Sequence, residues 1–333
     1  MRTVSIKKGG FDVTVVSLGT LSMGGDEVWG PSEEAESIRT IHRAMDLGIT
    51  FYDTAAFYGF GRSETILGKA MAGRRDKYVI STKCGLDWDT GEGSPFTVRN
   101  GHQVTTNLSA KGVRRSLENS LRRLAVDHVD ICYTHRQSVP PAFTPIEETM
   151  TTLMKMKEEG KLRCIGVSNV TIQQLKEYMK WGQVDIVQEY CSMLNPACLR
   201  ELNDHCLAND IMFHCYSVFE RGLLTGAYSM DSKVTPGDPR NEWSVWYQPA
   251  KRKKVIDLIT SWEPLCKKYN CTQSALTVAW TLQQAPNMIV VDGSRRVTTI
   301  EKNAQGGAFL IEQDDLAAMN TAITSLLKEE GII

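Results

Sequence analysis

Short apolar runs alternate with longer amphipathic segments along most of the chain. Helical periodicity marks segments such as Glu33–Leu47, which is followed by Gly48, and Pro145–Glu159, which is followed by Gly160. Eight β-branched and aromatic runs between such segments predict strands, at Val15–Leu18, Thr50–Asp53, Tyr78–Lys83, Val129–Tyr133, Cys164–Val167, Ile186–Gln188, Met212–Tyr216 and Met288–Val291. This alternation predicts parallel strands covered by helices, an α/β fold.

Eight strand–helix units over roughly 300 residues favour a closed (β/α)8 TIM barrel over two doubly wound domains. An open Rossmann sheet is the alternative, but Gly19–Gly25 (GTLSMGG) lacks the G-x-G-x-x-G spacing. Two alternating runs around Gly9-Gly10 predict an N-terminal β-hairpin. Helices over Ala250–Tyr269 and Gln313–Leu327 add to the C-terminal part. No linker divides the sequence, so residues 1–333 are expected to form a single domain.

Three local features complete the predicted fold. Ser63 is a candidate N-cap for a helix that runs to Met71. The polar, glycine-rich stretch Asp87–Gly101 predicts a loop. His214 lies in an alternating strand, and its side chain is expected to face the helical layer.

Composition narrows the class of protein. The 38 basic and 39 acidic residues give a formal net charge of −1, which does not favour nucleic acid or a membrane surface. No apolar run approaches the roughly 18 residues of a membrane span, and the N-terminus shows no secretion signal. The nine cysteines have irregular spacing without a CxxC motif, which predicts a reduced, cytoplasmic protein without structural zinc. Nothing in the sequence indicates an oligomer.

Polar side chains follow most of the predicted strands. Barrels of this kind carry their active sites at the carboxyl ends of the strands. Asp53, Lys83 and His135 end the second, third and fourth strands. The later strands end at further hydrogen-bonding groups, namely Ser168, Asn169, Gln188, Tyr216, Ser217 and Ser294. One polar cluster at one end of the barrel is therefore expected.

The chemistry expected of this cluster is proton and hydride transfer. Tyr58 lies in a glycine-rich loop five residues after Asp53, and a buried Lys83 would lower the pKa of its phenol. Asp53 would hold Lys83 charged, and His135 would donate a hydrogen bond to a carbonyl oxygen. Tyr58 would be the general acid for reduction and the base for the reverse reaction. No side chain supplies a hydride, so a nicotinamide cofactor is expected.

The same strand ends offer groups for that cofactor. Tyr216 has an aromatic face for the nicotinamide ring, while Ser168, Asn169 and Gln188 suit its carboxamide. Arg295 and Arg296 follow the last strand and are suited to pair with a phosphate, and an adenosine 2′-phosphate would indicate NADP. No metal is expected.

Several motifs taken in order resemble the aldo-keto reductases: DTAAFYGFGRSETILGKAM, STKCG, YTHR, IGVSN, VQEYCSMLNP, YSVFERGLLTG and GSRRVTTIEKN. The resemblance is to the bacterial branch similar to potassium-channel β-subunits. It implies a (β/α)8 barrel that binds NADP(H), with Asp53, Tyr58, Lys83 and His135 as catalytic tetrad. It also implies cofactor contacts at Ser168, Asn169, Gln188, Tyr216, Ser217, Gly222, Leu224, Gly293, Arg295, Thr299 and Asn303.

The chain departs from the family pattern at Val218, Asp292 and Thr299, where proline, proline and glutamine are common, and Gln137 stands where an acid is usual. Some of these positions bear on the adenine end, so NADP (NADPH) is expected while NAD stays open.

Loop residues suggest where a substrate would bind. Trp29, Phe57 and Trp88, with Trp243 and Trp246, are expected to rim the pocket mouth, where aromatic rings can stack on a sugar. Arg136, Arg221 and Arg240 are candidates for an anionic substrate group. The expected substrate is a small carbonyl compound, with a sugar aldehyde or ketose as first choice.

The expected function is NADP(H)-dependent reduction of an aldehyde or ketone to an alcohol. A sugar dehydrogenase working in the oxidative direction is one alternative. A regulatory module that binds NADP(H) with little turnover is another. A metal-dependent barrel hydrolase using Asp53 and His135 is a third, and it predicts loss of activity on chelation.

Overall fold

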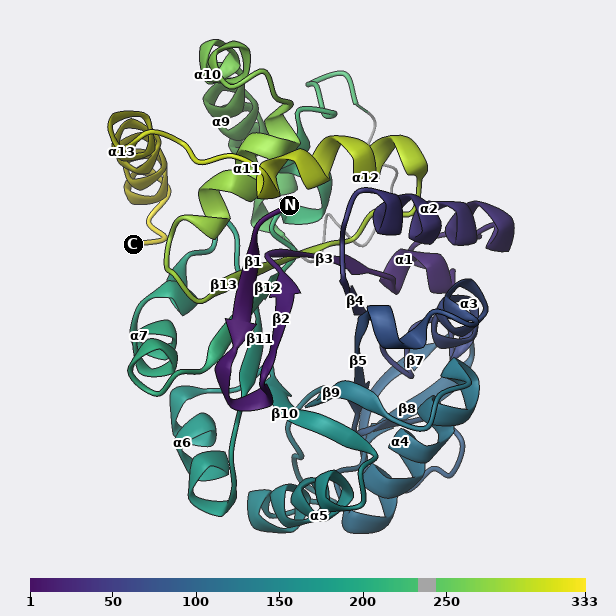
Figure 1. Cartoon of the computed structure of the whole chain (residues 1–333). Coiled ribbons are helices and arrows are strands. Elements are labelled where there is room, and N and C mark those ends of the chain that lie inside the picture. The colour runs from purple at the N-terminus through teal and green to yellow at the C-terminus, as the bar shows by residue number, and fades with distance from the viewer. Residues whose placement is uncertain (233–243) are drawn as a thin grey trace.

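Eight parallel strands close into a barrel, which confirms the predicted fold class (Figure 1). The computed structural model describes residues 1–232 and 244–333. Around the barrel the strands follow in the order β3 (Val16–Gly19), β4 (Phe51–Asp53), β5 (Val79–Cys84), β9 (Val129–Thr134), β10 (Leu162–Ser168), β11 (Ile186–Tyr190), β12 (Met212–Tyr216) and β13 (Met288–Asp292). Asp53 pairs in register with Gly19 and Ser81, so the ends of three neighbouring strands lie level.

Helices form the outer layer (Figure 1). They are α1 (Leu21–Gly24), α2 (Glu34–Asp46), α3 (Arg62–Met71), α4 (Ala110–Leu124), α5 (Ile146–Glu158), α6 (Ile172–Trp181), α7 (Glu201–Ala208), α9 (Pro249–Thr260), α10 (Glu263–Lys268), α11 (Gln273–Leu282), α12 (Val297–Asn303) and α13 (Gln313–Glu329). Local sequence sets their starts: Ser109 accepts a hydrogen bond from the Gly112 N–H at α4, and Thr171 and Gln174 form a capping box at α6.

The predicted N-terminal hairpin closes one end of the barrel. Strands β1 (Thr3–Ile6) and β2 (Phe11–Thr14) pair antiparallel across a turn that ends at Gly10. Ile6 and Val13 pack against Phe51 and other inward side chains of the barrel strands. Figure 1 shows the hairpin across the barrel. The polar strand ends are therefore left at the opposite end.

The stretch from 87 to 101, predicted as a loop, contains the end of one strand and the whole of another in a small antiparallel sheet, so that prediction was wrong. Strand β8 (His102–Thr106) pairs with both β6 (Leu86–Asp87) and β7 (Ser94–Arg99). Asn100 and Gly101, between β7 and β8, both have positive φ, 48° and 75°. An Asn-Gly pair suits such a two-residue hairpin turn.

Two helix predictions also needed correction. Helix α3 begins at Arg62 after Gly61, and Ser63 is not its cap. The Ser63 hydroxyl instead donates to the Thr20 carbonyl oxygen at 2.9 Å, which ties two loops together. The single helix predicted over Ala250–Tyr269 is two, α9 and α10, and a proline lies in the first turn of α10, where its missing N–H costs no hydrogen bond.

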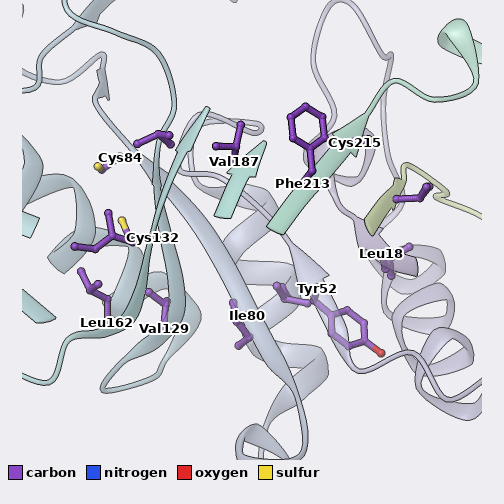
Figure 2. Packing of buried hydrophobic residues seen from close by; sticks show 14 of the residues in the cluster. Leu18, Tyr52, Ile80, Cys84, Val129, Cys132, Leu162, Val187, Phe213 and Cys215 are labelled. Atoms are coloured by element: carbon purple, nitrogen blue, oxygen red, sulfur yellow. The ribbon is translucent and has the colours of Figure 1, made fainter. Parts of the chain in front are cut away.

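The core has two layers because successive strand residues face opposite sides. Figure 2 shows the outer layer, where Phe213 and Cys215 belong to the cluster between strands and helices. Met212, one residue before Phe213, packs in the inner cluster. His214 shares that inner face and is fully buried inside the barrel. The expectation that His214 faces the helices was therefore wrong. Tyr216 lies two residues further along the same strand and was expected to face the site, so it could have shown that His214 also points inward.

Within the described residues, no helix is both long and apolar enough to span a bilayer. All nine cysteines are free thiols, and six of them are buried.

Candidate active site

A buried ion pair joins the ends of β4 and β5. Lys83 Nζ lies 2.7 Å from Asp53 Oδ2, and each residue is 2% exposed. Lys83 also donates to the Thr54 carbonyl oxygen at 3.0 Å, while the Ser81 hydroxyl donates to Asp53 Oδ1 at 2.7 Å. Burial alone would raise the pKa of Asp53 and lower that of Lys83, but their mutual attraction outweighs it in both. Both groups are therefore charged.

Tyr58 lies beside this pair. Lys83 Nζ is 4.8 Å from the centre of the Tyr58 ring. The loop that carries Tyr58 is held by a close backbone approach, since a Cβ on Gly59 would lie 2.4 Å from the Gly24 carbonyl oxygen. Burial raises the pKa of the Tyr58 hydroxyl and outweighs the lowering by Lys83. The lowering influence expected of Lys83 is present, but the net shift is upward, so the phenol holds its proton at neutral pH.

His135 completes the group. Its ring centre lies 5.8 Å from that of Tyr58 and 6.3 Å from that of Phe57, with near-perpendicular rings. The backbone N–H of His135 donates to the Cys84 carbonyl oxygen at 2.8 Å, which fixes His135 next to β5. Burial and then Lys83 hold the pKa of His135 well below its usual value, so the imidazole is neutral. The structure thus brings Asp53, Tyr58, Lys83 and His135 together.

A second network, not predicted from the sequence, lies beneath the ion pair. The Gln188 amide nitrogen is 3.0 Å from both Asp53 Oδ1 and His214 Nδ1. The Tyr133 hydroxyl is also 3.0 Å from His214 Nδ1, and Ser17 Oγ is 2.7 Å from His214 Nε2. Burial lowers the pKa of His214 to about 3, so this histidine is neutral.

The residues expected to hold a nicotinamide ring lie on neighbouring strand ends. The Tyr216 hydroxyl donates to Asn169 Oδ1 at 2.7 Å, and Asn169 Nδ2 donates to the His135 carbonyl oxygen at 2.9 Å and to Ser168 Oγ at 3.1 Å. The Tyr216 ring is half-buried, while Ser168 is buried. Gln188 is 2% exposed and uses its amide nitrogen within the protein, which leaves its amide oxygen as the group for a ligand.

The turn after β12 has an unusual backbone. Ser217, Glu220, Arg221 and Gly222 all have positive φ, with Gly222 at 105°. Three of these are not glycine, and such strain tends to gather at binding sites. Leu224 is buried, and its carbonyl oxygen accepts from the Thr277 hydroxyl at 3.0 Å.

The expected phosphate and adenine contacts lie around the start of α12. Arg295 donates to the Trp29 carbonyl oxygen at 2.8 Å, while Gly293 and Arg296 are exposed and Thr299 is half-buried. Asn303 is buried and donates to Asp292 Oδ1 at 2.9 Å, so its side chain is turned toward the protein.

The four expected substrate contacts are spread along the rim. Phe57 lies next to His135, whereas Trp88 lies one ring further out, packed on Phe60 at 5.4 Å. Arg136 is exposed, with its guanidinium 4.7 Å from the Phe96 ring centre. Trp29 contacts Arg295 through its backbone.

The other rim candidates differ in position. Trp246 is 3% exposed and packs in a third apolar cluster, separate from the two layers of the barrel core, so it does not rim a pocket. Arg221 lies 3.6 Å from Glu220. Trp243 and Arg240 fall outside the described residues.

These groups fit a nicotinamide cofactor better than a metal. His135 Nδ1 is buried and has no hydrogen-bond partner among the described residues, and the half-buried Tyr216 is hydrogen-bonded to the Asn169 amide. The Asp53 carboxylate is occupied by Lys83, Ser81 and Gln188. Over residues 1–232 and 244–333, no three His, Cys, Asp or Glu side chains are grouped so as to hold a metal ion.

Known proteins with similar sequences cover nearly the whole chain. A model described as the aldo/keto reductase family matches residues 15–324. An NADH-specific methylglyoxal reductase from Escherichia coli (strain K12) is 40% identical over 96% of this chain and 98% of its own length. The aldo-keto reductase YhdN from Bacillus subtilis (strain 168) is 30% identical over 99% and 96%.

Solved structures agree with these matches. A glycerol dehydrogenase from Gluconobacter oxydans superposes with a TM-score of 0.86 at 28% identity, over 98% of this chain and 95% of that one. An aldo-keto reductase from Klebsiella pneumoniae, solved in complex with NADPH, shares the fold at 21% identity, with a TM-score of 0.71 over 96% and 95%. The family model and the relatives together show that the chain belongs to the aldo/keto reductase family, as its motifs predicted.

Proposed function

We propose that this enzyme reduces a small aldehyde or ketone to an alcohol, with a nicotinamide dinucleotide as hydride donor and Tyr58 as proton donor. The observation that carries the proposal is the position of the Tyr58 ring, 4.8 Å from Lys83 Nζ and 5.8 Å from the His135 ring. A phenol, a buried cation and a neutral imidazole are the groups that a carbonyl oxygen needs as it gains negative charge.

Each residue has a separate part in this reaction. The Tyr58 phenol is protonated at neutral pH and gives its proton to the carbonyl oxygen. Lys83, kept charged by Asp53, stabilises the phenolate that remains. Neutral His135 donates an N–H to the same oxygen and orients the substrate. In the oxidative direction the phenolate would take the proton back, so an alcohol dehydrogenase uses the same groups.

The cofactor would be held by the strand ends after β10, β11 and β12. Bound there, a reduced nicotinamide supplies the hydride that no side chain can provide. Tyr216 presents a half-buried ring for stacking, Asn169 is hydrogen-bonded to both Tyr216 and Ser168, and Gln188 lies on the strand between β10 and β12. The remaining expected contacts, at Ser217, Gly222, Leu224, Gly293, Thr299 and Asn303, lie in the turn after β12 and around α12.

Two sets of charges bear on the choice between NADPH and NADH. Arg295 and Arg296 favour a 2′-phosphate and support the expected NADP(H). Glu36 of α2 opposes it, because its carboxylate lies 3.5 Å from the Val297 N–H, beside Arg296, and would repel a phosphate. The similar Escherichia coli reductase is named NADH-specific. Measured dissociation constants for NADPH and NADH will decide which coenzyme the protein prefers.

The substrate is proposed to be a small carbonyl compound. The Phe57 ring, 6.3 Å from that of His135, gives the rim an apolar side chain, and the exposed Arg136 next to His135 in the chain adds a positive charge. A sugar aldehyde and an α-oxoaldehyde both suit this rim; methylglyoxal, named for the Escherichia coli relative, is of the second kind. We also propose that the enzyme works in the cytoplasm, because all nine of its cysteines are free thiols.

The test is the loss of reduced-nicotinamide absorbance with a panel of sugar aldehydes, ketoses, methylglyoxal and simple aldehydes. We expect turnover with at least one panel member and no effect of a chelator. Tight binding of NADH or NADPH without turnover of any compound in the panel would instead support a regulatory module that binds the cofactor.

A further inference from the structure

Two of the three partly exposed cysteines lie side by side at the end of α10. Cys266 is in the last turn of the helix, and Cys271 follows it, just before α11. Each thiol shifts the pKa of the other, so the two side chains lie close together. Six of the other cysteines are buried, and Cys198 is the third that is partly exposed.

The helix end explains why the two side chains meet. The Cys271 N–H donates to the Cys266 carbonyl oxygen at 2.9 Å, and the Asn270 N–H donates to the Lys267 carbonyl oxygen at 3.2 Å. Asn270 has φ of 47°, the left-handed conformation that ends a helix in this way. In this Schellman arrangement the third-last helical residue contacts the second residue beyond the cap, and here both are cysteine.

The pair also faces an open space. Cys266 and Cys271 line a surface hollow of about 480 Å³ between the end of α10 and Gln305. A hollow of this size admits a small molecule. The contrast with the Cys84–Cys132 pair is clear, because Cys84 also raises the pKa of Cys132 but these residues are only 1% and 0% exposed.

We propose that Cys266 and Cys271 form a reversible redox pair that small-molecule disulfides oxidise to an internal disulfide. The Cys266 thiolate attacks the small disulfide, forms a mixed disulfide and releases one thiol. Cys271 then attacks the Cys266 sulfur, forms the Cys266–Cys271 bond and releases the second thiol. Two protein thiols are oxidised as one disulfide is reduced to two thiols.

The electrostatic surroundings give the two cysteines these separate parts. The neighbouring Cys271 thiol lowers the pKa of the Cys266 thiol and outweighs burial and Glu263, which raise it. The neighbouring Cys266 thiol, followed by burial, raises the pKa of Cys271. Cys266 is thus the better thiolate, and Cys271 reacts second.

The test treats the full-length protein with oxidised glutathione and follows free thiols and intact mass. We expect the loss of two titratable thiols and of two hydrogen atoms in mass, with the bridge mapped to residues 266 and 271 and reversed by dithiothreitol. Cys271→Ser should stop at a glutathione adduct on Cys266, and Cys266→Ser should form no bridge. Cys198→Ser is the matched control and should behave as wild type.

Two results would overturn the proposal. One is wild-type protein that keeps both thiols free after this treatment. The other is wild-type protein that accumulates the mixed disulfide without closing the bridge, because contact between the two thiols would then be ruled out.

Discussion

The amide nitrogen of Gln188 lies 3.0 Å from Asp53 and 3.0 Å from His214, and so links the buried ion pair to a histidine inside the barrel. Because Gln188 donates, neutral His214 accepts at Nδ1 and carries its proton on Nε2, facing Ser17. The Ser17 hydroxyl in turn donates to the Val290 carbonyl oxygen at 3.2 Å. The orientation of Asp53 therefore depends on His214, which reaches it through the Gln188 amide.

Replacing His214 tests this positioning role. His214→Leu leaves a buried Gln188 N–H without an acceptor, which should cost about 1–3 kcal/mol in the free energy of unfolding. It should also lower kcat and shift the pH profile of kcat, because Asp53 and Lys83 lose their fixed orientation. His214→Asn supplies a hydrogen-bond acceptor at a similar distance from the backbone. It should restore much of the stability and of the kcat that the Leu variant loses. Urea unfolding and kcat across pH measure these effects, and a Leu variant with wild-type values in both would contradict the role.

The Tyr58 hydroxyl is the proposed proton donor, so Tyr58→Phe removes the reaction's acid and leaves the cofactor contacts in place. Turnover should fall by about 10²–10⁴-fold, the usual worth of general acid catalysis. The affinity for reduced nicotinamide, measured by fluorescence titration, should stay close to wild type. Near-normal turnover in this variant would remove Tyr58 from the mechanism.

The Asp53–Lys83 ion pair predicts a strong coupling between two substitutions. Lys83→Met leaves the Asp53 carboxylate buried and unpaired, which should cost about 3–5 kcal/mol. Adding Asp53→Asn removes the stranded charge and should recover most of that stability while activity stays lost. A double-mutant cycle by urea unfolding gives the coupling energy. Additive effects of the two substitutions would show that the residues do not form the buried pair seen here.

The sequence predicted the barrel and the grouping of the tetrad for a simple reason. Parallel strands in one barrel end at the same face, so Asp53, Lys83 and His135 had to approach one another once eight strands were recognised. Tyr58 belongs to a loop and has no periodic signal; its place in a glycine-rich loop five residues after Asp53 made it a candidate, and the family motifs agreed. The roles of these residues and of the cofactor contacts remain predictions.

Other features depended on details that periodicity does not carry. The position of His214 required the inward face of β12 to be identified, and Tyr216 marks that face. The sheet between β6 and β8 followed from the Asn100-Gly101 turn inside a stretch whose polarity suggested a loop. The net rise of the Tyr58 pKa results from burial, which a sequence shows only indirectly.

Coenzyme preference should respond to the charges around α12. Arg295→Ala or Arg296→Ala should weaken NADPH by about tenfold and NADH much less, if a 2′-phosphate binds there. Glu36→Gln should do the opposite and strengthen NADPH relative to NADH. Glu34→Gln, which changes a neighbouring acid of α2 that pairs with Lys69, is the matched control. Dissociation constants from fluorescence titration measure both, and equal changes for the two coenzymes would place the adenosine elsewhere.

Asp292 predicts an unusual dependence of stability on pH. Its carboxyl group is fully buried, and although Ser294 and Asn303 donate to Oδ1, Oδ2 has no hydrogen-bond partner among the described residues. Burial raises the pKa of Asp292 from 3.8 to about 6. Folding therefore favours the protonated form, and the stability that it contributes is present below the unfolded pKa of about 4.

That stability is lost as the pH rises from about 4 through about 6, and the full loss is on the order of 3 kcal/mol. Asp292→Asn imitates the protonated carboxyl and cannot ionise. The stability of this variant relative to wild type should therefore increase over that interval and level off above it. Urea unfolding at several pH values measures the difference, with the exposed Asp314→Asn as control. A difference that does not change with pH would mean that Asp292 has the same pKa in the folded and unfolded protein, which would contradict the effect of burial.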